Sequence, residues 1–224
     1  MTASRRWGAL CVLAVIATIC GCDTSTPPSR MSASSVQRES LRLDPRECAR
    51  TPPTGAIDRV AYDLRFTRGR MLVAVSPSGG TGRCYSFAKS GNASPEVPPD
   101  SLLFTFSGPG TDGAQLEFLA GDLTGGGPPP VAGTPAPGPL TGPITSLVGV
   151  SVHGVYSSSA TCRLAVTAMS STLAAGHFTC PDATASPANP FSPNDEGPFD
   201  GPSAPATPSD ADAATLSGWF ELTP

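Results

Sequence analysis

Residues 102–118 read LLFTFSGPGTDGAQLEF, and this stretch decides the fold class. Gly108–Gly113 is rich in glycine and carries Pro109, a composition typical of a tight connection between two strands. Alternation of apolar residues with a period of two is the mark of a half-buried strand. It occurs on both sides of the connection: Leu102, Phe104 and Phe106 before it, and Ala114, Leu116 and Phe118 after it. The stretch therefore predicts an antiparallel hairpin with one apolar face.

The same period of two recurs along most of the chain, and no segment has the pattern of an amphipathic helix within the core. Seven further strands are predicted, at 60–66, 71–75, 83–88, 145–156, 161–167, 176–180 and 216–222. Together with the hairpin they make about nine short strands, which is typical of an all-β domain. We therefore predict an antiparallel sandwich or a partly open barrel.

Two segments lack this periodicity and are rich in proline and glycine. They cover residues 124–143 and 181–212, and strands resume after each. Such segments bury too little apolar surface to offset their ordering entropy, so we expect long flexible insertions between strands. We therefore predict that residues 47–224 form a single β domain with these two insertions.

The first 21 residues have the features of a secretory signal peptide. Arg5 and Arg6 form a basic start, and Ala9–Cys20 is then apolar apart from Thr18. This run is shorter than the roughly 20 apolar residues that a membrane-spanning helix needs. A basic start followed by a short apolar run predicts export.

The end of this signal, Ile19-Cys20-Gly21-Cys22, resembles the lipobox of bacterial lipoproteins. The resemblance implies cleavage after Gly21 and acylation of Cys22, which would attach the chain to the outer face of the cell membrane. Residues 22–46 would then form a flexible tether. The composition, with many Ala, Gly and Pro and few Lys, also resembles that of an actinobacterial protein.

Removing residues 1–21 and committing Cys22 to a lipid leaves an even number of cysteines: Cys48, Cys84, Cys162 and Cys180. An even number in an exported chain predicts disulfides. Antiparallel pairing of the strands 161–167 and 176–180 places Cys162 opposite Cys180, with Leu164 opposite Phe178. We therefore predict the bond Cys162–Cys180 and, by elimination, Cys48–Cys84.

The pattern offers no recognisable catalytic or metal-binding constellation. Neither cysteine pair has Cys-x-x-Cys spacing, and the glycine-rich segment Ser76–Gly82 lacks the lysine of a P-loop. His153 and His177 are both predicted on the polar faces of strands, as surface residues rather than bases. We therefore expect no enzyme activity, no cofactor and no metal.

Nucleic acid is excluded as a partner because the net charge is −4 and no basic, aromatic surface pattern is present. The preferred hypothesis is a lipid-anchored, non-enzymatic structural or interaction module of the envelope, with an envelope protein, a lipid or a glycan as partner. The first alternative is a carrier or receptor for a hydrophobic or glycan ligand, which would need a cavity that the core does not fill. The second is a hydrolase with an unrecognised site.

Overall fold

The computed structural model describes residues 42–125, 139–186, 188–192 and 213–224, which form a β structure with almost no helix. In chain order the elements are β1 (Arg42–Leu43), α1 (Pro45–Cys48), β2 (Arg68–Pro77), β3 (Arg83–Ser90), β4 (Glu96–Val97), β5 (Ser101–Ser107), β6 (Gly113–Leu119), α2 (Ala120–Thr124), β7 (Ile144–Val152), β8 (Val155–Met169), β9 (Ala174–Ser186) and β10 (Ala213–Thr223). The all-β prediction is confirmed. Within the described residues, no helix is long and apolar enough to cross a membrane.

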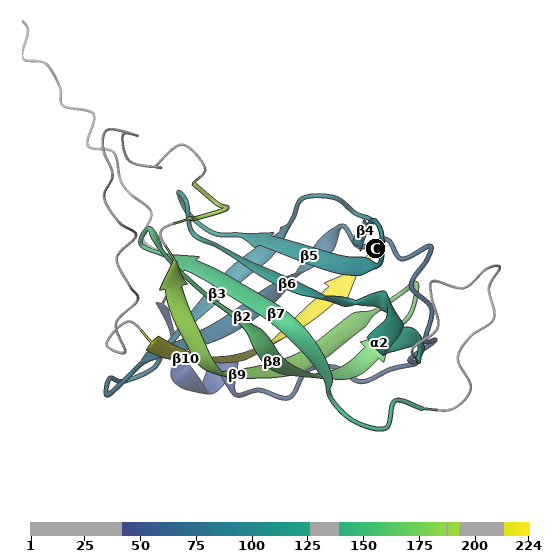
Figure 1. Ribbon diagram of the computed structural model, residues 1–224, viewed down its shortest axis with the longest axis horizontal. Helices are drawn as coiled ribbons and strands as arrows, with labels where there is room; N and C mark the ends of the chain where they lie inside the picture. The colour runs from purple at the N-terminus through teal and green to yellow at the C-terminus, as the bar shows by residue number, and fades with distance from the viewer. Residues whose placement is uncertain (1–41, 126–138, 187, 193–212) are drawn as a thin grey trace, which may run out of the picture. The chain divides into compact units, whose positions relative to one another are not determined.

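Eight of the described strands close into an antiparallel barrel (Figure 1). The strands of the ring are β2, β3 and β5–β10. Each pairs with the ring strand that follows it along the chain, and the last one, β10, pairs with the first, β2. The ring closes where Ala88–Ser90 of β3 pair with Thr105–Ser107 of β5. The two-residue strands β1 and β4 lie outside the ring, on β3 and β5 respectively. Of the two predicted architectures, the barrel is the one that forms, and its ring is closed.

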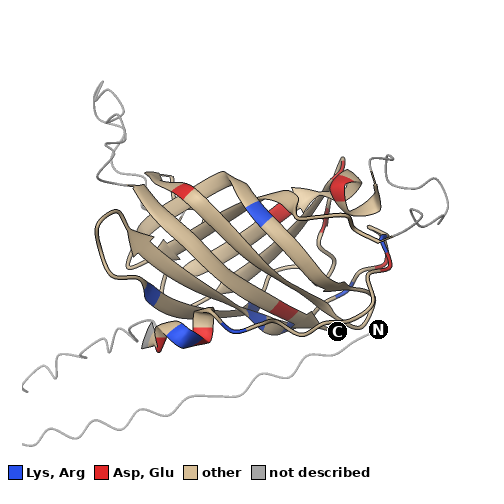
Figure 2. Cartoon of the chain, turned by 90° about the horizontal axis from the view of Figure 1, so that it is seen from below, with Lys and Arg blue, Asp and Glu red and all other residues tan. Residues whose placement is uncertain are grey.

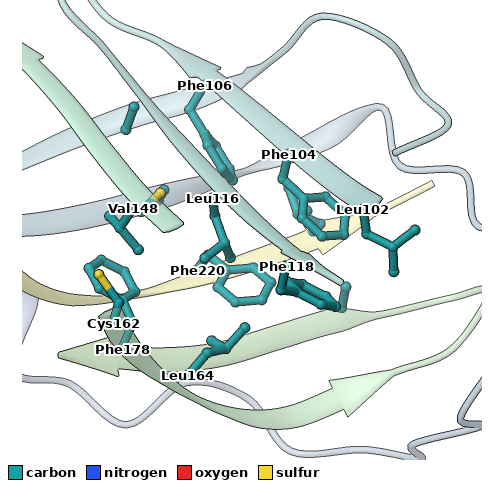
Figure 3. Close-up of a cluster of buried hydrophobic side chains, with 14 of the residues drawn as sticks. Leu102, Phe104, Phe106, Leu116, Phe118, Val148, Cys162, Leu164, Phe178 and Phe220 are labelled. Atoms are coloured by element: carbon teal, nitrogen blue, oxygen red, sulfur yellow. The ribbon is translucent and has the colours of Figure 1, made fainter. Parts of the chain in front are cut away.

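The barrel interior is packed with aromatic rings contributed by the predicted inward faces (Figure 3). The hairpin of β5 and β6 has the register expected from its alternation, with Phe104 opposite Leu116 and Leu102 opposite Phe118. The ring centroid of Phe104 lies 6.1 Å from that of Phe220 and 6.0 Å from that of Phe118. Each of these side chains is almost completely buried. Contacts between rings from different strands therefore hold opposite walls of the barrel together.

Two predicted strands differ from the structure. Residues 60–66 alternate as expected, and Leu64 and Phe66 are buried in the barrel core, but this segment is irregular and β2 begins only at Arg68. The predicted strand 145–156 is instead two strands, β7 and β8, which meet at a two-residue turn. In addition, β8 and β9 are longer than predicted, with 15 and 13 residues.

Both predicted disulfides are present. Cys162–Cys180 joins β8 to β9 in the barrel core, and the predicted neighbouring pair of Leu164 and Phe178 is confirmed. Cys48–Cys84 joins α1 to β3 on the outside of the barrel. These bonds span 18 and 36 residues of sequence and, in the chain-entropy model, stabilise the fold by about 3 and 4 kcal/mol. Because such bonds persist in oxidising compartments, they indicate an extracytoplasmic protein.

A second, smaller apolar cluster lies on the outer face of the barrel beneath α1. It contains the Cys48–Cys84 disulfide, Leu72 and Trp219. The indole nitrogen of Trp219 donates a hydrogen bond of 2.8 Å to the carbonyl oxygen of Glu47. This cluster fixes the N-terminal segment of the domain to β2, β3 and β10.

Several domain predictions fall on residues that are not described. The signal peptide 1–21 and most of the tether 22–46 lie outside the described residues. The tether ends earlier than predicted, because Arg42 and Leu43 already pair with Tyr85 and Cys84. Most of the insertions 124–143 and 181–212 also lies outside the described residues, but β9 continues to Ser186, so the second insertion begins later than expected.

Two leucines of β6 test the importance of the packed interior. Leu116 is fully buried, whereas Leu119 is 50% exposed. We expect Leu116→Ala to lower the free energy of unfolding by about 2–5 kcal/mol, because it leaves a cavity in the core. Leu119→Ala should change it by less than about 0.5 kcal/mol. Urea unfolding of both variants measures the difference; equal effects would show that the interior does not carry the stability.

Candidate ligand-binding site

A cavity of about 510 Å³ lies at one mouth of the barrel, between β2 and β3 on one side and β7 and β8 on the other. Its walls continue the inward faces of these strands beyond the aromatic core. The apolar lining residues are Val75, Pro77, Tyr85, Val150, Val152 and Val155, and the polar ones are Thr81, Arg83, His153 and Ser157. Valine and serine side chains are much smaller than the phenylalanines deeper in the barrel, so this end of the interior is not filled.

The tip of the β7–β8 hairpin forms one rim of the cavity. Val152 pairs with Val155, and only His153 and Gly154 connect them, with φ values of 53° and 81°. Two positive φ values in a two-residue loop define a type I′ turn, which matches the right-handed twist of the flanking strands. The prediction that His153 lies on the polar face of a strand is therefore wrong, because the chain reverses at this residue.

Contacts from two other elements hold the hairpin tip in place. The backbone N–H of His153 donates a hydrogen bond of 2.7 Å to a carboxylate oxygen of Asp112, in the β5–β6 loop. The imidazole ring lies edge-on to the ring of Tyr85 on β3, with 6.3 Å between centroids. Through this contact, the hairpin tip and β3 meet across the barrel mouth.

The outer side of the same hairpin is braced by Tyr156. Its ring covers Gly149, where a side chain would collide with the phenol oxygen, and this oxygen accepts a hydrogen bond of 2.8 Å from Gln115. Burial raises the pKa of Tyr156. Phe191, from the segment after β9, packs against the Tyr156 ring with 6.3 Å between centroids. The wall that presents Val150 and Val152 to the cavity is thus supported from behind.

Arg83 is the charged residue of the cavity lining. It precedes the inward-facing Tyr85 and Phe87 on β3 at a spacing of two residues and therefore points to the same side, at the mouth. It is exposed and makes no ion pair or hydrogen bond with any described residue. Among the described residues that line the cavity, none has an acidic side chain. The site therefore combines an apolar hollow with one cation at its edge.

The other residues singled out from the sequence lie elsewhere. His177 is on β9, opposite Trp219, and lines a shallow hollow beside α1 on the outside of the barrel. In the part of the chain that is described, no three His, Cys, Asp or Glu side chains gather in a metal-binding arrangement. Cys22 lies outside the described residues. Ser76–Gly82 does connect two strands, β2 and β3, as predicted.

The sequence contained two signals for this site that were not used. The dipeptide His153-Gly154 interrupts a run of alternating valines, which is a hairpin signal. Val148, Val150 and Val152 also alternate without any large side chain, unlike the phenylalanine-bearing faces of β5 and β6. Such a series indicates a part of the interior that the residues present do not fill.

The fold and the site together define a class: an extracytoplasmic, closed eight-stranded barrel with an apolar cavity at its mouth. No protein-family model, no curated protein and no solved structure matches the chain.

Two glycines test whether the type I′ turn positions the rim. Gly154 and Gly142 both have open space where a side chain would begin, but only Gly154 has a positive φ. We expect Gly154→Ala to lower the free energy of unfolding by about 1–2 kcal/mol, because an L-residue is strained in the left-handed region. Gly142→Ala should change it by less than about 0.5 kcal/mol. Thermal and urea unfolding measure both; equal losses would contradict the turn assignment.

Proposed function

We propose that this protein is a lipid-anchored binding protein of the cell envelope, whose barrel mouth holds a small, largely hydrophobic ligand. The observation that carries the proposal is the cavity between β2, β3, β7 and β8. Its volume of about 510 Å³ lies within the range of about 300–1,000 Å³ that is typical of small-molecule sites. This is the feature that distinguishes a carrier or receptor from a purely structural module.

The packing of the barrel limits where a ligand can sit. An eight-stranded barrel has an interior just wide enough to be filled by side chains or to hold one small ligand. Here both solutions occur in one barrel, because phenylalanines fill the middle (Figure 3) and other residues, mainly valines, line the mouth. A ligand therefore enters from the β7–β8 end and stops above the aromatic core.

The polar groups at the mouth favour binding over catalysis. A general base must lie within hydrogen-bond reach of its nucleophile, at about 2.6–3.2 Å. Among the described residues, no hydrogen bond joins the imidazole of His153 to a hydroxyl or to a carboxylate; its ring contacts Tyr85 instead. The hydrogen bond to Asp112 comes from the backbone of His153. These contacts support a non-enzymatic role.

The lipid anchor is supported by the sequence around Cys22 and by the oxidising compartment that the disulfides indicate. Figure 2 shows that charged residues are sparse along the barrel strands in this view. A membrane-held binding protein keeps its ligand close to the envelope. The tether then needs only to attach the barrel, and Cys48–Cys84 fixes the end of this tether to β3.

Replacing the acylated residue tests the anchor. We expect the wild-type chain to fractionate with the membrane and to carry an acyl mass at its N-terminus. Cys22→Ala should be found in the soluble extracytoplasmic fraction without that mass, while Cys20→Ala, which changes a residue of the discarded signal, should still be acylated. Fractionation and intact-mass spectrometry measure both. A membrane-bound Cys22→Ala chain would contradict the proposal.

Filling the mouth tests the cavity. We expect the neutral fluorescent probe N-phenyl-1-naphthylamine to bind with a stoichiometry of one per chain. Val152→Trp should weaken binding at least about tenfold, which corresponds to about 1.4 kcal/mol, because the larger side chain occupies the space. Thr145→Trp, at an exposed position of the same strand, should bind like the wild type. Failure of the wild type to bind the probe would contradict the proposed function.

A further inference from the structure

We infer that the ligand is a small amphiphilic anion, an alkyl chain with a single carboxylate, whose head group pairs with Arg83 at the rim of the cavity. This inference rests on the proposed function and specifies the ligand class of the same site. Three observations carry it: the position of Arg83 above an apolar wall, its lack of a hydrogen-bond or ion-pair partner among the described residues, and the distribution of charge on the described residues around it.

The position of Arg83 is fixed by strand alternation and pairing. It pairs with Val75 of β2, and its next inward neighbour on β3 is Tyr85, so apolar residues flank it on two sides. The aliphatic stem of an arginine can lie along such a surface while its charged end stays in water. A ligand chain seated against Val150 and Val152 would bring its head group to this edge.

Within the described residues the guanidinium of Arg83 makes no hydrogen bond or ion pair, and neither do those of Arg65 and Arg163, but of these three arginines it is Arg83 that lines the cavity. Arg68 donates a hydrogen bond to the carbonyl oxygen of Pro224, and Arg70 forms an ion pair of 2.9 Å with Glu221. Arg83 forms neither kind of contact with any described residue. A carboxylate can accept two parallel hydrogen bonds from a guanidinium, and this planar geometry suits arginine better than lysine.

The charge on the described residues of the rim favours an anion at Arg83. The described lining residues include no Asp or Glu, and the carboxylate of Asp112 accepts the backbone hydrogen bond of His153. The chain as a whole carries a net charge of −4, so it does not attract anions non-specifically. Binding of an anion would therefore depend on Arg83.

A glycan fits this site less well than an amphiphile. Recognition of a sugar needs several polar groups that converge on its hydroxyls, because each buried polar group must be paired. The lining is mainly valine, and its polar groups lie at Thr81, Arg83, His153 and Ser157, with one cation among them. An apolar chain with one charged end matches this division.

Decanoate and decanol differ mainly in the charge of the head group, and therefore test the inference directly. The exported chain carrying Cys22→Ala keeps the whole barrel and avoids detergent, so both probes can be titrated by calorimetry in dilute buffered salt. We expect decanoate to bind about tenfold more tightly than decanol. Arg83→Gln should remove this preference, so that decanoate no longer binds more tightly than decanol. Arg163→Gln, at an exposed position of β8, should keep the preference.

The outcomes separate this inference from the proposed function. Equal affinity for decanoate and decanol, with both lost in Val152→Trp, would overturn the anion inference and leave the cavity as a hydrophobic site. Binding of N-phenyl-1-naphthylamine without binding of decanoate would also overturn it. A loss of preference in Arg163→Gln as large as in Arg83→Gln would mean that general charge, and not the rim, selects the anion. Failure to bind any of the three probes would remove the proposed function itself.

Discussion

The pairing of β3 with β5 is the constraint on which the rest of the structure depends. Three residue pairs, Ala88–Ser90 with Ser107–Thr105, convert an open eight-stranded sheet, in which β10 already pairs with β2, into a ring. Unpaired strand edges expose backbone groups that can pair with other chains, and closure removes them. Closure also fixes the width of the interior, because the number of strands and their tilt together determine the diameter of a barrel. The side chains inside must then either fill that width or leave a cavity.

The inward-facing side chains fill this fixed width in the middle of the barrel but not at its mouth. In the middle, Phe104 and Phe220 from nearly opposite walls stack with 6.1 Å between centroids, and no space remains. At the mouth, Val150 and Val152 take the equivalent inward positions and do not reach across. The cavity therefore arises because the inward-facing side chains at the mouth are small, and not because the sheet is interrupted.

The sequence predicts a strand correctly where its alternation of apolar and polar residues matches the buried and exposed faces that the strand has in the fold. The β5–β6 register and the Cys162–Cys180 bond follow from period-two alternation and short connections. Residues 60–66 alternate too, yet form no strand, because apolar residues that pack into the core give the same pattern. The cavity could not be predicted in this way. It requires β2 and β3 to face β7 and β8, and that arrangement depends on the ring, in which β10 pairs with β2 from the other end of the domain sequence.

The tether and the candidate site share one strand. β5 pairs with only one end of β3, at Ala88–Ser90. Farther along the same edge of β3, β1 pairs with Cys84 and Tyr85. Cys84 faces outward and bonds covalently to Cys48, whereas Tyr85 faces inward and lines the cavity. A strand alternates between its two faces, so adjacent residues can serve both purposes without competing for space. The covalent link to the N-terminal segment therefore lies on the outer face of β3, one residue away from a residue of the cavity wall.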